Sequence, residues 1–404
     1  HAGPADLMTD LQILMRFPTE APYRIDQVTN NPGLMLSLAI GQLFLAGLLS
    51  RVTAARLWWT TAGLQLITIA VFFTLASWGT SDIARFSHHL AINPNEVLQE
   101  PAWIAIAPLI TILPYRLAFV QGLVSAGFGL IPLLLARHWR RPHWGGWWAL
   151  LLVWSPLLRN FLQNGVTRQA LATLLITPLL LRSAGWSHPT WLWVGIAIAG
   201  SGLSHNSLAV TAALAVVPLL TRPALLTSNN NRKALLFSAV LVVGTALIAF
   251  SHPAIQQKLN HYLFETGYYN TYGLRNEVLG LELTALMAVL LTVWRAKLNL
   301  HSMASCHDCR TLLAYTLMLG LVQLSMATGV LAPIVSRCLD PIGLFWLLAL
   351  LAWTSRHHCA WTLIPVLAVV GESFIDDRIL SLEDCIGGDQ FMCPPDRWPW
   401  QINY

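Results

Sequence analysis

Charged residues are scarce in this chain of 404 residues: 11% are Asp, Glu, Lys or Arg, whereas 55% are hydrophobic. A soluble domain carries about 25% charged residues, so this composition excludes an ordinary soluble domain. No G-x-x-x-x-G-K-[ST] loop for nucleotide phosphates is present. The close cysteine pair, Cys306 and Cys309, has no second pair with which to complete a four-ligand zinc site. We therefore expect no metal, no cofactor and no nucleic-acid partner.

Long apolar runs take the place of charge. A spanning helix needs about 20 mostly apolar residues, so we predict an all-α, polytopic membrane bundle of about twelve spanning helices, forming one transmembrane domain over residues 1–404. A shorter apolar run, Ala102–Leu113, lies between two prolines and is predicted to be re-entrant or interfacial. The predicted spans are 33–50, 57–76, 116–136, 145–158, 168–182, 190–204, 206–221, 235–251, 279–296, 311–331, 340–355 and 360–374.

The loops between these segments alternate in charge. One set holds more than half of the Lys and Arg residues and a single acid, Asp308. Basic residues concentrate in cytoplasmic loops, so this set is predicted to be cytoplasmic and both chain ends, with the tail 373–404, to be outside. Residues 1–32 would then have to cross the membrane, and we expect an additional helix, or a cleaved signal peptide, before His1. The cytoplasmic set is 51–56, 137–144, 182–189, 222–234, 295–310 and 355–359.

The stretch RNFLQNGVTRQALA, Arg159–Ala172, places charged and polar groups between two apolar segments at the predicted outer face. Such groups are expensive near a bilayer and are usually functional. Arg168 and Arg337 also lie at outer helix ends, and Arg168 is expected at a helix start, where anions are attracted. We predict that Arg159, Arg168 and Arg337 line one outward-opening cavity that binds pyrophosphate. The alternative is snorkelling to lipid headgroups, or ion pairing.

Three further features of the loops are candidates. His205, in SHNSLAV, could transfer a proton or donate a hydrogen bond, or it could be a helix-turn residue satisfied by the backbone. The long outer loop 252–278 is expected to contact glycan through its aromatic and polar residues, although interfacial anchoring by tyrosine is equally consistent. The basic stretch 137–143 is expected to bind anionic membrane lipid. The glycan-contacting residues proposed are Tyr268, Tyr269 and Arg275, and the acids Asp82, Glu96 and Glu100 are expected to be solvated charges.

RNFLQNGVTRQALA, SHNSLAV and SRCLDPIGLF together resemble the EpsG-like branch of the Wzy polysaccharide polymerases. Glu100-Pro101 before an apolar run is a weaker match. The order of segments agrees from about residue 30 to residue 372, but the motifs themselves cover a small part of the chain. Thr167 intervenes where the related pattern often has Arg directly, and SRCLDPIG lacks the usual downstream aromatic residue. The matching positions are Asn164, Arg168, Gln169, Ala172, His205 and Arg337.

The resemblance implies a glycosyl polymerase in the bacterial inner membrane, with its active site facing outside. It would join undecaprenyl-pyrophosphate-linked repeat units into an exopolysaccharide or O-antigen, by an inverting transfer with the lipid pyrophosphate as leaving group. Membrane lipid and a chain-length regulator protein are the further partners. The implied catalytic residues are Arg168, His205 and Arg337, and the implied substrate-binding residues include Arg159, Asn164 and Gln169.

Two alternatives remain open. The first is a multi-pass glycosyltransferase that uses a polyprenyl-phosphate sugar donor. That class usually carries an acid in its first outer loop, and Asp6, Asp10 or Asp26 could serve. The second is a lipid-linked glycan transporter, which the clustering of charges at helix ends disfavours, because alternating access needs charges deep within helices.

Overall fold

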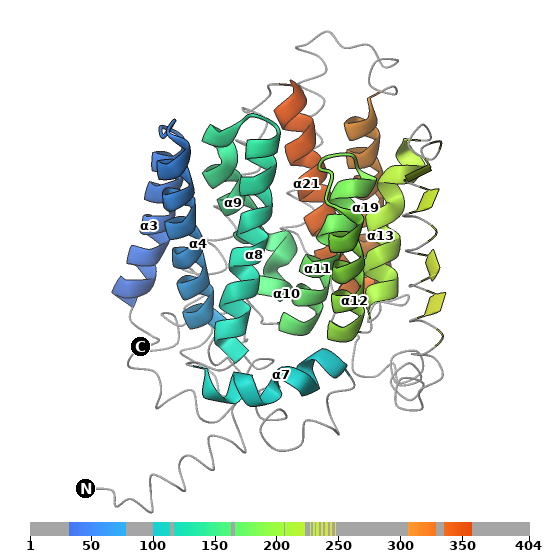
Figure 1. The fold of residues 1–404 in the computed structure, drawn as a ribbon, viewed down its shortest axis with the longest axis horizontal. Coiled ribbons are helices and arrows are strands. Elements are labelled where there is room, and N and C mark those ends of the chain that lie inside the picture. Colours follow the sequence, from blue (N-terminus) through green and yellow to red (C-terminus); the bar gives the residue numbers. More distant parts are fainter. Residues whose placement is uncertain are drawn as a thin grey trace, which may run out of the picture. The chain divides into compact units, whose positions relative to one another are not determined.

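The computed structural model of the protein describes residues 32–77, 100–113, 117–162, 166–205, 207–222, 306–328 and 335–357, with scattered residues between 227 and 247. Every regular element in these ranges is an α-helix or a short 3-10 helix (Figure 1). The chain divides into two compact units. The first lies within 1–154, 159–170 and 372–404, and the second within 155–158 and 171–371.

The first unit is built around α4, which packs between α3 and α8, while α9 packs against α3 and α8. In Figure 1, α7 runs crosswise to α4 and α8, as a segment too short to span would be expected to do. Its placement at an interface stays a prediction. The elements are α3 (Pro32–Leu49), α4 (Ala55–Ser77), α7 (Pro101–Ile112), α8 (Leu117–His138), η1 (Pro142–Trp144), α9 (Gly145–Val153) and α10 (Arg159–Leu162).

The second unit is centred on α21, which packs against α19, α13 and the short turn η2. Most of α21 is fully buried, from Leu344 to Trp353. A helix that is apolar on every side is typical of such a central position. The elements are η2 (Pro156–Leu158), α11 (Thr167–Ser183, which begins in the first unit), α12 (Trp191–Ser204), α13 (Leu208–Thr221), α19 (His307–Thr328), η4 (Ser336–Cys338) and α21 (Leu339–His357).

The predicted all-α class is confirmed for the described residues, because the observed helices nearly coincide with the predicted apolar segments. Three of the described helices, α4, α8 and α19, are long and apolar enough to cross a membrane, judged by length and composition. The total of about twelve spans stays a prediction. Two of the predicted spans, 279–296 and 360–374, lie outside the described residues, and so does most of 235–251.

The predicted segment 145–158 is interrupted in the structure. Its helix, α9, ends at Val153, and a 3-10 turn begins at Pro156. Proline has no N–H to continue a helix and disfavours helical backbone in the residue before it, here Ser155. The Ser155 hydroxyl accepts a bond from the N–H of Leu157 at 3.2 Å, which stabilises the break.

Apolar side chains cover the outside of these helices, and polar side chains lie inside. On α3, Leu36, Ile40 and Phe44 are all exposed and follow one another at helical spacing. By contrast, Gln42 and Gln65 are fully buried. The interior is mainly apolar as well, and the large exposed apolar surface, which soluble proteins keep small, is consistent with a membrane protein.

The buried glutamines connect helices of the first unit. Gln65 of α4 donates from Nε2 to the carbonyl oxygen of Gly146 on α9 at 3.1 Å. Gln42 of α3 accepts at Oε1 from the indole Nε1 of Trp154 at 3.0 Å. Small residues allow this close approach: a Cβ added at Gly146 would come within 2.8 Å of the Cα of Ala46. Helix association in lipid depends on such small residues and buried polar bonds.

Gly122 of α8 offers a test of this packing. A Cβ there would collide with the Thr74 hydroxyl and the Ala70 carbonyl oxygen on α4. We expect Gly122→Ala to destabilise the detergent-solubilised protein by about 1–3 kcal/mol, because overpacking forces the helices apart. Gly63→Ala on α4 is the matched control, since nothing lies within 4 Å of its added Cβ. Equal melting temperatures for the two variants would contradict the close α4–α8 contact.

Candidate functional site

Arg168 lies in the first turn of α11, which begins at Thr167. The helix start is defined by the N–H of Ala170, which donates to the carbonyl oxygen of Val166 at 3.0 Å. The predicted helix start is therefore confirmed. No acidic residue occupies the first turn, so the partial positive charge of the helix N-terminus and the guanidinium attract anions together.

The guanidinium of Arg168 is paired with a buried acid. Its Nη1 donates to Oε2 of Glu100 at 3.0 Å, and the side chain of Glu100 is only 2% exposed, against 28% for Arg168. The expectation that Glu100 is a solvated charge is therefore wrong. A buried carboxylate needs a partner because desolvating an isolated charge is very costly.

Local sequence places Glu100 directly before the start of a helix. Pro101 begins α7 and fixes Glu100 as the residue that precedes the first turn. Two residues later comes Trp103, fully buried, whose N–H donates to the carbonyl oxygen of Glu100 at 3.1 Å. The signal available in the sequence was an acid placed directly before a proline-initiated apolar helix, while its partner Arg168 is distant in sequence.

A second buried contact joins α10 to α11, the two helices that flank the polar residues of 159–172. Gln121 of α8 is fully buried. It accepts at Oε1 from the Thr167 hydroxyl at 2.7 Å and donates from Nε2 to the carbonyl oxygen of Phe161. One side chain thus holds both the end of α10 and the start of α11. Gln169, in the same turn as Arg168, is also buried.

The other predicted site residues are distributed as follows. Arg159 begins α10 in the first unit, whereas His205 and Arg337 belong to the second unit, so their shared cavity with Arg168 stays a prediction. Arg337 is exposed in η4, the turn before α21. The residues Asn164, Tyr268, Tyr269 and Arg275 lie outside the described part of the chain.

His205 closes α12 as its C-cap, with its backbone N–H donating to Ser201 at 3.0 Å. Its ring Nδ1 lies 3.0 Å from the backbone N–H of Ser207 and 2.8 Å from the Ser207 hydroxyl. Because a backbone N–H can only donate, Nδ1 must accept, and the proton of the neutral ring is on Nε2. The local sequence therefore fixes the tautomer of this histidine.

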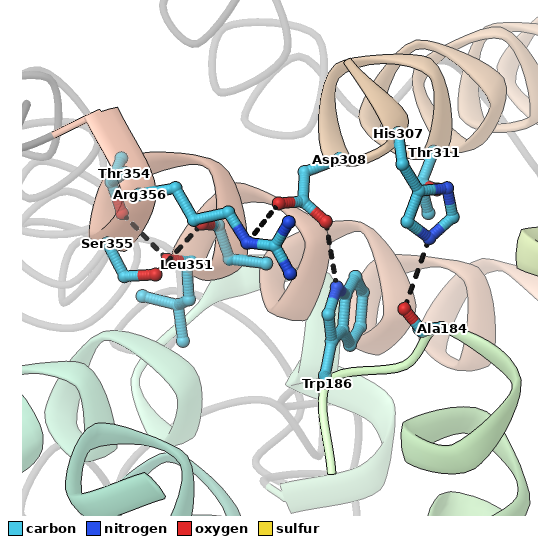
Figure 2. A network of polar contacts seen from close by, with 10 residues as sticks. Ala184, Trp186, His307, Asp308, Thr311, Leu351, Thr354, Ser355 and Arg356 are labelled. Carbon is cyan, nitrogen blue, oxygen red and sulfur yellow. Dashed lines mark hydrogen bonds and ion pairs between the residues drawn. The ribbon is translucent and has the colours of Figure 1, made fainter. Parts of the chain in front are cut away.

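A separate polar cluster, which the sequence analysis missed, lies in the second unit (Figure 2). Asp308, fully buried at the start of α19, accepts from the indole Nε1 of Trp186 at 3.1 Å. Its other oxygen lies 2.7 Å from Nε of Arg356, near the end of α21. The sequence did contain one signal for this cluster: Asp308 is the single acid of the loops predicted to be cytoplasmic. A buried acid needs a cation as its partner.

His307 continues this cluster. Its Nε2 lies 3.1 Å from the carbonyl oxygen of Ala184, just after α11 (Figure 2), so Nε2 carries the proton. On the other side of the ring, Nδ1 lies 3.2 Å from the hydroxyl of Thr221, the last residue of α13. Three loops predicted to be cytoplasmic and the end of α13 are thereby connected. In the described residues, no group of three or more His, Cys, Asp or Glu side chains could hold a metal ion.

No protein-family model, curated protein or solved structure matches this chain.

The Asp308 cluster yields a stability prediction. We expect Asp308→Asn to destabilise the purified protein by about 1–3 kcal/mol, because it removes the charge that Arg356 and Trp186 share. Loss of monodisperse protein after stepwise heating measures the effect. Lys233→Gln, which removes a charge from an exposed side chain, is the control. Identical melting of the two variants would show that the cluster does not stabilise the unit.

Proposed function

We propose that this chain is a membrane glycosyl polymerase that joins oligosaccharide units linked to a polyprenyl pyrophosphate, at the outer face of the membrane. The observation that carries the proposal is the Arg168–Glu100 pair. The resemblance to Wzy-type polymerases rests on both residues, yet they belong to separate motifs 68 positions apart. Their contact gives the two motifs one physical explanation.

The chemistry of Arg168 suits a pyrophosphate leaving group. Negative charge grows on the leaving oxygen as the glycosidic bond breaks, so a fixed cation stabilises the transition state more than the ground state. A guanidinium carries five N–H donors, more than a single carboxylate oxygen can engage, and grips phosphate oxygens through two parallel bonds. The N-terminus of α11 adds its own attraction for the same group.

Glu100 acts in this proposal as a positioning residue. It holds the Arg168 guanidinium through Nη1, and its own burial on α7 keeps that contact from being replaced by water. Gln121 fixes the start of α11 independently through Thr167. A preorganised cation contributes more to catalysis than a mobile one, because no reorganisation is needed during reaction.

His205 is proposed to orient substrate and not to act as the base. With Nδ1 accepting from Ser207, the neutral ring presents an N–H at Nε2, which can donate to a sugar oxygen. Service as a base through Nε2 would require the other tautomer and would break the Ser207 bond. The general base that deprotonates the acceptor hydroxyl is therefore assigned to another group.

The function is tested by the lipid-linked glycans of a deletion strain. A polymerase mutant accumulates single repeat units on lipid, and the wild-type gene restores long chains. Long chains that lack one branch sugar would instead identify a transferase with a polyprenyl-phosphate donor. Accumulation of intact units on the cytoplasmic side alone would identify a transporter.

Arg168→Ala is expected to lower the polymerisation rate by about 10²–10³, the effect of removing one donor from a charge-stabilising site. Arg168→Lys should recover part of the rate, because lysine keeps the charge without the paired donors. Glu100→Gln should fall between them. Polymer amount relative to membrane-protein level is the measurement, and normal polymer in Arg168→Ala would reject the proposed role.

Variants of His205 distinguish a role as hydrogen-bond donor from a role as general base. His205→Asn, which keeps a side-chain N–H, is expected to retain more activity than His205→Ala, with little change in rate between pH 6 and pH 8. The comparison is made on pH–rate profiles of purified protein. Equal loss in both variants, with a wild-type rate that rises across this pH range, would return His205 to the part of base.

A further inference from the structure

Five arginines and one exposed tryptophan lie at one end of the first unit, at the loops predicted to be cytoplasmic. It comes from the turn after α3, the first turn of α4, and the connection from α8 through η1. The described stretches of these helices contain no Asp or Glu. The residues are Arg51, Arg56, Trp59, Arg137, Arg140 and Arg141, and we name them the basic cluster.

Direct contacts join the end of α8 and η1 to the start of α4. The guanidinium carbon of Arg137 lies 5.6 Å from the ring centre of Trp58 and 5.3 Å from that of Trp59. The indole Nε1 of buried Trp58 donates to the carbonyl oxygen of Pro142 at 3.2 Å, which ties η1 to α4. Arg137 is exposed, and cation–π contacts with both rings hold its guanidinium. Burial and, secondarily, the charge of Arg141 lower the pKa of nearby His143, so that ring adds no charge at pH 7.

The backbone at Arg140 supplies independent evidence. Arg140 has φ +57°, the one positive φ of a non-glycine residue in the described chain. The N–H of Arg141 donates to Ala136 at 2.6 Å and that of Arg140 to Arg137 at 3.1 Å. These two bonds form a Schellman motif, whose left-handed residue is usually glycine.

The end of α11 has the same Schellman motif with glycine at the left-handed position. There Trp186 donates to Leu181 at 3.0 Å and Gly185 to Arg182 at 3.1 Å, with Gly185 at φ +66°. The two helix ends have equivalent hydrogen bonds, but one uses glycine and the other uses arginine. Arg140 therefore adopts a left-handed backbone conformation that favours glycine, which is a ground for proposing a function for its side chain.

We propose that the basic cluster is a binding site for the headgroup of one anionic phospholipid. Arginines from three chain segments lie at this end of the unit and supply donors for a phosphate, and exposed Trp59 suits the interfacial depth at which headgroups lie. Charge complementarity favours an anionic lipid over a zwitterionic one. This inference is independent of the proposed polymerase activity.

The test is native mass spectrometry of the full chain in detergent, with phosphatidylglycerol and phosphatidylcholine of identical acyl chains. Wild-type protein should retain phosphatidylglycerol preferentially, and the preference should weaken with salt. Arg140→Gly should weaken phosphatidylglycerol binding about fivefold, with phosphatidylcholine unaffected. Its melting temperature should stay equal or rise, because glycine relieves the strained position. Arg56→Gln should show the same loss of lipid.

Four outcomes would overturn the proposal. Equal retention of the two lipids would show no headgroup recognition. An equal loss in Lys233→Gln, an exposed charge of the second unit, would show diffuse attraction instead of a site. A lower melting temperature in Arg140→Gly would make the Arg140 side chain structural. Full displacement by soluble glycerol phosphate at equal concentration would identify a site for a free phosphate ester.

Discussion

Buried polar side chains that bond across helices are the interaction on which this fold depends. The helices present apolar surface outward, so apolar burial alone gives them little reason to associate in a bilayer. Gln42, Gln65 and Gln121 supply that reason in the first unit, because each is fully buried and bonds to a different segment of the chain. In lipid, a polar group without an internal partner costs several kcal/mol, so these bonds select one arrangement of helices.

Buried acids extend the same logic to charge. Glu100 and Asp308 each lie next to the start of a helix, and each is paired with an arginine distant in sequence. The two pairs differ in their surroundings. Asp308 is also bonded by Trp186 and sits within a cluster that joins helix ends, which is the pattern of a structural connection. Glu100 instead holds an arginine in the first turn of α11, where the proposed pyrophosphate site needs a fixed cation.

Hydropathy predicts the positions of the described helices well, because a chain in lipid must satisfy its backbone within each segment. It also locates Arg168 at a helix start, since apolar residues follow it without a break. Hydropathy does not predict which residues pair across the fold. Glu100 looks like any loop acid in the sequence, yet it is buried against Arg168. Asp308 pairs with Arg356, which is 48 positions away on another helix. Pairing over such separations depends on packing, which a single sequence does not encode in any local pattern. Pro156 was a local signal, however, and the break in 145–158 could have been predicted from it.

The two proposals give arginine two different purposes within the first unit. Arg168 is held by a buried carboxylate, so its charge is largely balanced until a stronger anion arrives, and its geometry is set in advance. The arginines of the basic cluster lie on stretches without acids, and their charges add to one another. A balanced, fixed cation suits a site that must discriminate a reacting pyrophosphate, whereas a summed positive field suits a persistent anionic headgroup. The left-handed backbone of Arg140 fits the proposed lipid site. Its charge contributes most to binding where neighbouring arginines share the same phosphate.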